Sequence, residues 1–76
     1  MVISGVLFET VSGKVSAVAL RLAQVKDIVI IGSDGDHKIA AVWRGKHGAV
    51  LLRAADQLFK SDPDILGIFP TFVGNE

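Results

Sequence analysis

Few residues of this chain have the types and spacing that catalysis or metal binding requires. Asp34 and Asp36 could begin a calcium-binding loop, but the later oxygen ligands and the closing glutamate are missing, so the Asp34-Gly35 pair predicts a tight hairpin turn instead. His37 and His47 have no cysteine or second histidine nearby, and a metal site typically needs three or four ligands. We therefore expect no metal centre and no bound cofactor.

Phosphate-binding and nucleophilic motifs are also incomplete. Gly13-Lys14 resembles the end of a phosphate-binding loop, but Phe8 stands where the first glycine is needed and Val15 where a hydroxyl residue is needed. The amides of residues 45–48 could face an anion, yet every helix start offers such amides. No serine, histidine and aspartate set can be assembled, so the sequence predicts a binding protein and not an enzyme.

The composition limits the remaining functions. The chain has 76 residues, of which 50% are hydrophobic, so residues 1–76 form a single domain with a thin core. Because it contains no cysteine, disulfide miniproteins, cysteine-ligated zinc modules and thiol enzymes are excluded. Eight basic residues balance eight acidic ones, which argues against a nucleic-acid partner. With no signal-peptide pattern and no run near 18 apolar residues, we expect a cytoplasmic protein without membrane insertion.

The periodicity of apolar residues predicts four strands and two helices. Strands are expected at residues 2–8, 28–31, 37–44 and 65–73. The first helix starts from Ser12 as N-cap and carries one apolar stripe, formed by Val15, Val18, Ala19, Leu22 and Val25. The second helix has a similar stripe at Leu51, Leu52, Ala55, Leu58 and Phe59, and it ends at Asp62-Pro63. Pro70 lacks a backbone donor, so the last strand lies at an edge of the sheet.

The order of these elements, βαββαβ, predicts the fold. Right-handed crossovers place both helices on one face of an antiparallel sheet, which gives an α+β, ferredoxin-like sandwich with the strand order 4-1-3-2. Strands 1 and 3 are then central. The edge position of strand 4 agrees with the independent argument from Pro70.

Alternation along the strands divides their side chains between two faces. In residues 37–44 the set with Ile39, Ala41 and Trp43 faces the helices, because the other set carries Lys38 and Arg44. The sets that contain Ser4 and Thr71 are assigned to the helix-free face because those residues are polar. This assignment buries Leu7, Leu22, Trp43, Leu58 and Ile68 between sheet and helices. It leaves an apolar helix-free face, typical of a binding surface, with Val6, Phe8, Val42, Phe69 and Val73 around Arg44 and Lys38.

The whole chain resembles the NapD family. The resemblance lies in the opening strand Val-Ile-Ser-Gly-Val-Leu-Phe, the single amphipathic helix after it, the Asp-Gly hairpin and the closing stretch Asp-Ile-Leu-Gly-Ile-Phe-Pro-Thr-Phe-Val. NapD proteins are small cytoplasmic chaperones for maturation of the periplasmic nitrate reductase. The resemblance implies a ferredoxin-like domain that binds the twin-arginine signal peptide of the nitrate reductase catalytic subunit precursor until its molybdenum cofactor is inserted. Together with the apolar face, it predicts peptide contacts from Val6, Phe8, Val42, Arg44, Phe69 and Thr71.

A second hypothesis is a small regulatory or oligomerisation module of the amino-acid-sensing (ACT-like) type. Such modules share the βαββαβ order and bind a small effector at a dimer interface. Glycines in loops, such as Gly13 and Gly32, could approach such a ligand closely. A homodimer that covers the apolar face in the absence of peptide is consistent with either hypothesis.

Overall fold

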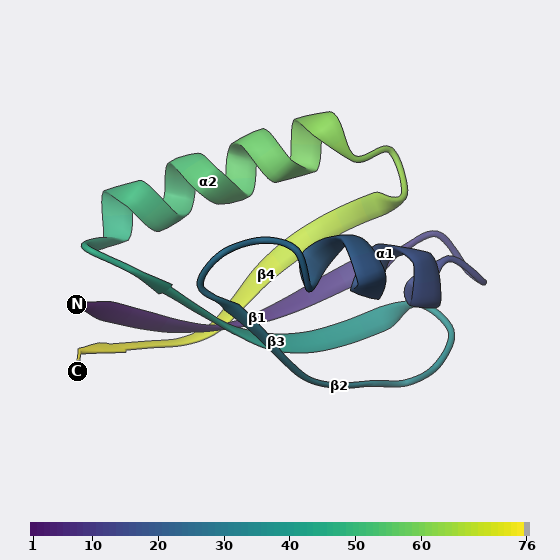
Figure 1. Cartoon of the computed structure of the whole chain (residues 1–76), viewed down its shortest axis with the longest axis horizontal. Helices are drawn as coiled ribbons and strands as arrows, with labels where there is room; N and C mark the ends of the chain where they lie inside the picture. Colours follow the sequence, from purple (N-terminus) through teal and green to yellow (C-terminus); the bar gives the residue numbers. More distant parts are fainter. Residues whose placement is uncertain (76) are drawn as a thin grey trace.

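The computed structural model describes residues 1–75 and has the element order that the sequence predicts. The elements are β1 (Val2–Thr10), α1 (Val15–Leu22), β2 (Ile28–Ser33), β3 (Lys38–Gly45), α2 (Gly48–Ser61) and β4 (Ile65–Asn75). All strand pairs are antiparallel and the strand order is β2-β3-β1-β4, which is the predicted order read from the other edge. Both helices lie on one side of the sheet (Figure 1). The α+β class is thus confirmed, and the arrangement is compatible with a ferredoxin-like sandwich.

Both edge strands contain irregularities, and β4 has two, because its pairing with β1 also shifts at Leu66. In β4, Pro70 pairs with Val6 and Phe72 pairs with Gly5, so Thr71 is an extra residue that forms a bulge. In β2 the pairing with β3 shifts in the same way at Ile31. The predicted edge position of β4 is confirmed, and its proline stands beside the bulge, where a missing backbone donor is tolerated.

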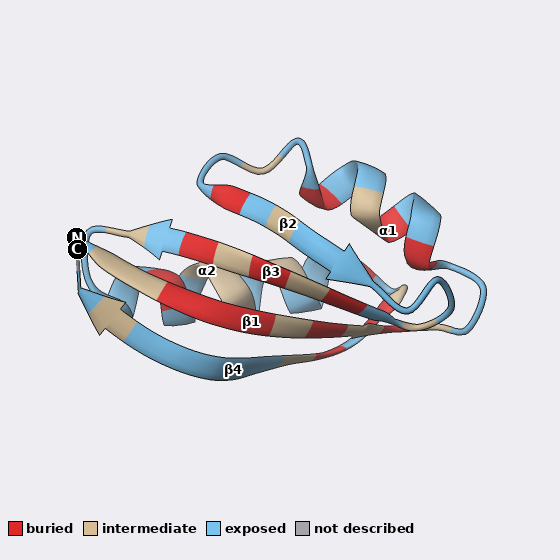
Figure 2. Ribbon diagram, turned by 90° about the horizontal axis from the view of Figure 1, so that it is seen from below, coloured by how far each residue is buried: buried red, intermediate tan, exposed pale blue. Residues whose placement is uncertain are grey.

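The core lies between the helices and the central strands, where Figure 2 shows the buried residues concentrated along β1 and β3. Phe8 and Leu22 are fully buried, and Trp43 is 5% exposed. The rings of Phe8 and Trp43 lie 6.2 Å apart between centroids, tilted by 38°. Leu58 and Ile68 pack against this core from its margin. The buried apolar set is Val6, Phe8, Val15, Val18, Leu22, Ile28, Ile39, Ala41, Trp43, Leu51 and Ile65.

The assignment of faces was right for β3 and wrong for β1. Ile39, Ala41 and Trp43 face the helices as predicted, but so do Ser4, Val6 and Phe8. Leu7, expected in the core, is half-buried on the opposite face. The prediction for β1 is wrong because it places Ser4 on the helix-free face on the ground that serine is polar. Its Oγ instead lies 3.1 Å from the carbonyl oxygens of Gly5 and Phe72, so the hydroxyl is buried with a hydrogen bond.

The helices are held at their ends by polar contacts. Arg21 of α1 donates two hydrogen bonds of 2.9 Å to the carboxylate of Asp62, which follows α2, and one of 3.0 Å to Asp64. The predicted N-cap, Ser12, is wrong: Lys14 occupies that position and no side chain caps α1. No helix within residues 1–75 is long and apolar enough to cross a membrane.

Truncating neighbouring residues of β1 tests which face is the core. We expect Phe8→Ala to lower the free energy of unfolding by about 3 to 5 kcal/mol, because it opens a cavity against Trp43. Leu7→Ala, on the opposite face and half-buried, should cost about 1 kcal/mol. Urea denaturation of both variants measures the difference. Equal losses, or a larger loss for Leu7→Ala, would contradict the assignment of β1.

Candidate functional site

The sheet face that carries no helix is the candidate functional site, and we call it the helix-free face. The strand register identifies its members, since residues paired across neighbouring strands point to the same side. They are Val29 of β2, Lys38, Ala40, Val42 and Arg44 of β3, Ile3, Gly5, Leu7 and Glu9 of β1, and Phe69, Thr71 and Phe72 of β4.

The centre of the helix-free face is apolar. Leu7 is paired with Ala40 on one side and Phe69 on the other, and Gly5 is paired in the same way with Val42 and Phe72. Phe69 is 50% exposed and Phe72 is 55% exposed. Val29, on the other edge strand, is also exposed. Large apolar side chains therefore lie in solvent at both edges of this face, with smaller ones between them.

Two glycines allow the phenylalanine rings to lie over the backbone. A Cβ atom on Gly5 would collide with the ring of Phe72 and with Oγ1 of Thr71. A Cβ atom on Gly67 would lie 2.6 Å from the ring of Phe69. Both rings therefore rest on strand positions that have no side chain, and they form an aromatic surface along β4.

Charged residues lie at the ends of the helix-free face and not at its centre. Glu9 and Lys38 are directly opposite each other on β1 and β3, beside the β2–β3 hairpin. Arg44 is opposite Ile3 at the other end. The opposite charges of Glu9 and Lys38 offset each other across the two strands. The residues at the centre of the helix-free face are uncharged.

The structure brings together four of the six predicted peptide contacts. The residues on the helix-free face are Val42, Arg44, Phe69 and Thr71. Val6 and Phe8 do not belong to it, because they are 6% and 0% exposed in the core beneath the helices. Val73, expected on this face, lies on the helix side next to α2.

Sequence reasoning missed Ile3, Leu7, Val29 and Phe72. For β1 the sequence does indicate which side chains face the core. One of its two alternating sets ends in Phe8, the largest apolar side chain of the strand, and that set is the buried one. No comparable signal marks Phe72. The bulge at Thr71 interrupts the alternation, so Ile68, Pro70 and Val73 line the helix side while Phe72 turns to the other face.

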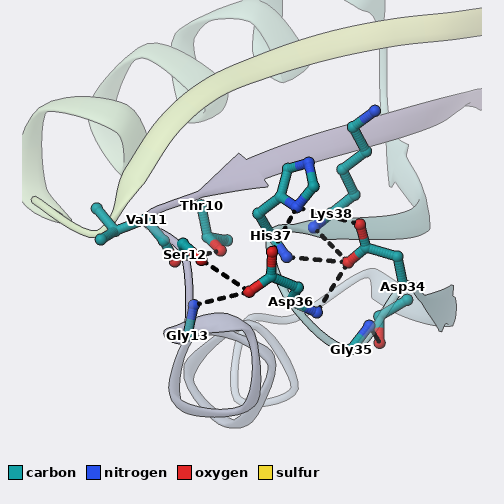
Figure 3. A network of polar contacts seen from close by, with 10 residues as sticks. Thr10, Val11, Ser12, Gly13, Asp34, Gly35, Asp36, His37 and Lys38 are labelled. Atoms are coloured by element: carbon teal, nitrogen blue, oxygen red, sulfur yellow. Dashed lines mark hydrogen bonds and ion pairs between the residues drawn. The ribbon is translucent and has the colours of Figure 1, made fainter.

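A polar network fastens the loops beside one end of this face (Figure 3). Oδ1 of Asp34 accepts hydrogen bonds of 2.9 Å from the backbone N–H groups of residues 36, 37 and 38. Gly35 has a φ of 79°, which confirms the predicted Asp-Gly hairpin turn. Oδ1 of Asp36 accepts a 2.8 Å bond from the hydroxyl of Ser12 and a 3.2 Å bond from the N–H of Gly13. The hairpin and the β1–α1 loop are thus joined, and the two aspartates have a structural role.

The network also keeps both aspartates ionised. Three backbone N–H donors stabilise the carboxylate of Asp34 and lower its pKa to about 2. The pKa of Asp36 is lowered by the hydrogen bond from Ser12 and by its contact with His37, whose Nδ1 lies 3.0 Å from Oδ2. Within residues 1–75, no group of three or more metal-ligating side chains is present.

Comparison of the chain with protein-family models, with curated proteins and with solved structures finds no match. The function must therefore be argued from the site itself.

The pKa of Asp34 predicts a loss of stability in acid. The folded state lowers this pKa below its ordinary value of 3.8, so Asp34 stabilises the fold above that pH, and the contribution is lost as the pH falls through about 2. We expect the free energy of unfolding to fall from pH 4 to pH 2, and to fall less steeply in Asp34→Asn, which removes the contribution of Asp34 and leaves that of Asp36. Urea denaturation across this range checks the slopes. An NMR titration midpoint of the Asp34 carboxyl at or above 3.8 would contradict the prediction.

Proposed function

We propose that this chain is a small cytoplasmic chaperone of the NapD type that binds the twin-arginine signal peptide of a molybdoenzyme precursor, the nitrate reductase catalytic subunit. The helix-free face receives the peptide. The observation that carries the proposal is the apolar surface of this face, which is bordered along β4 by the half-exposed Phe69 and Phe72. A contiguous apolar patch on a small soluble domain is typical of a surface that binds a protein partner.

The shape of the face favours a helical peptide. The rings of Phe69 and Phe72 form one border along β4 and Val29 lies at the opposite border, with Ala40 and Val42 between them. A signal peptide has an apolar stretch that can form an amphipathic helix, and such a helix can lay its apolar side on an apolar surface with borders of this kind. The predicted contacts Val42, Arg44, Phe69 and Thr71 remain part of the proposal, to which Leu7 and Phe72 are added.

The edges of the sheet argue against the other common way of binding a peptide, which is the addition of a strand. The bulge and Pro70 interrupt β4, and the bulge at Ile31 interrupts β2. A peptide strand needs a continuous row of backbone donors and acceptors, which neither edge offers over its full length. Docking onto the face is therefore favoured over pairing at an edge.

Apolar contacts supply most of the affinity in this proposal. Lys38 and Arg44 would repel the arginines of the peptide, and Glu9 is the one acidic side chain among the residues of the helix-free face. Because Lys38 lies directly opposite Glu9, neither end of the helix-free face strongly attracts the peptide arginines. The charges at the rim therefore contribute orientation at most, while burial of the phenylalanine rings stabilises the complex.

A synthetic leader peptide tests the proposal by titration calorimetry. We expect binding that persists at moderate salt and has a negative heat-capacity change, because apolar surface is buried. Phe69→Ala and Phe72→Ala should each weaken binding by about fivefold or more, that is by about 1 kcal/mol. Leu20→Ala is the control, since Leu20 is an apolar residue on α1 that is even more exposed, at 71%, and lies away from this face.

Two results would contradict the signal-peptide proposal. One is equal binding of a scrambled leader, which would show that the face has no preference for this sequence. The other is no binding of either peptide. In that case a change of molecular mass on addition of amino acids would favour the ACT-like regulatory module, for which the helix-free face offers a dimer interface.

A further inference from the structure

A second apolar feature lies on the other side of the sheet, where the first half of α2 stands above β1 and β4. A cavity of about 260 Å³ separates them. Its floor is formed by Ser4 and Val6 of β1 and by Trp43 of β3, and its roof by Leu51 and Ala55 of α2. This cavity lies opposite the helix-free face and plays no part in the proposed peptide binding.

The cavity exists because α2 cannot settle closer to the sheet. Leu51 already fills the space beside Gly45, where a Cβ atom would lie 2.9 Å from the leucine side chain. Leu51 is also the one buried residue of α2, with 9% of its surface exposed. Ser4 and Ala55 are too short to fill the gap that remains. The cavity opens to solvent between α2 and β4, beside Leu52 and Val73, which are 74% and 68% exposed.

The chemistry of the walls restricts what the cavity can bind. No charged side chain lines it within the described residues, and Ser4 is its one hydroxyl residue. That hydroxyl already donates within the protein, to the carbonyl oxygen of Gly5 or Phe72. A polar guest would lose most of its hydrogen bonds to water, because the walls offer side-chain polar groups only on Ser4 and Trp43, whereas an apolar guest loses none on entering.

We propose that this cavity is a binding site for one small, uncharged, apolar molecule, such as a single aromatic ring or a short alkyl chain. Its size supports this occupant, since an apolar cavity of about 150 Å³ in another protein stays dry and binds benzene. A helix or strand of a partner protein is too large for the space. The backbone of such a partner would also bring polar groups for which the walls have no partner.

The protein carries its own reporter for this site. Trp43 is the single tryptophan of the chain and there is no tyrosine, so intrinsic fluorescence reports on the surroundings of Trp43, a residue of the cavity wall. We would titrate the whole chain with toluene and follow both the fluorescence of Trp43 and the melting temperature. Benzoate, which has a similar ring and a negative charge, is the matched ligand control.

Three variants make the test specific. Ala55→Leu and Val73→Phe place additional apolar volume at the roof and at the mouth of the cavity, respectively. Ala49→Leu makes the same change as Ala55→Leu on the exposed side of α2, outside the cavity. Circular dichroism and the melting temperature without ligand identify any variant that fails to fold.

We expect toluene to change the fluorescence saturably and to raise the melting temperature of the natural chain and of Ala49→Leu. At least one folded filling variant should bind toluene tenfold more weakly or not at all, and benzoate should have no effect. No saturable change in the natural chain, equal responses to benzoate and toluene, or undiminished binding in both filling variants would overturn the proposal. Because no peptide is present, this result is independent of the test of signal-peptide binding.

Discussion

The contact between Phe8 and Trp43 determines which face of the sheet is covered by helices. With Phe8 directed to the helices, strand geometry directs Val6 and Ser4 the same way and places Leu7, Gly5 and Ile3 on the other side. Because β1 pairs with β3 and β4, the orientation of its side chains also fixes which side chains of those strands face the helices. The helix-free face is therefore a consequence of core packing on the opposite side.

Much of the fold could be predicted from the sequence because its signals are local. The Asp34-Gly35 turn, the helical stripes and the position of Pro70 each depend on a few neighbouring residues, and together they determine the element order and the strand order. The phase of β1 was harder, since both of its alternate sets are mainly apolar and a single serine decided the prediction wrongly. Ser4 is buried because β4 supplies a carbonyl oxygen 68 positions away, and local sequence does not reveal that partner.

The residues of the candidate site were likewise predicted where the signal is local and missed where it depends on strand pairing. Val42 and Arg44 were placed correctly because β3 alternates clearly between charged and apolar positions. Phe72 was missed because the bulge at Thr71 shifts the alternation by one residue. The collision that a side chain at Gly5 would cause with Phe72 is also invisible before the strands are paired.

Both edge strands carry a bulge, and this limits how copies of the chain can associate. A small domain with an exposed apolar sheet face is at risk of stacking into extended fibrils, in which each copy would prolong the sheet of its neighbour. Interrupted backbone rows at Ile31 and around Pro70 disfavour such growth at both edges. Association of copies is therefore directed away from the edges and toward the apolar face itself.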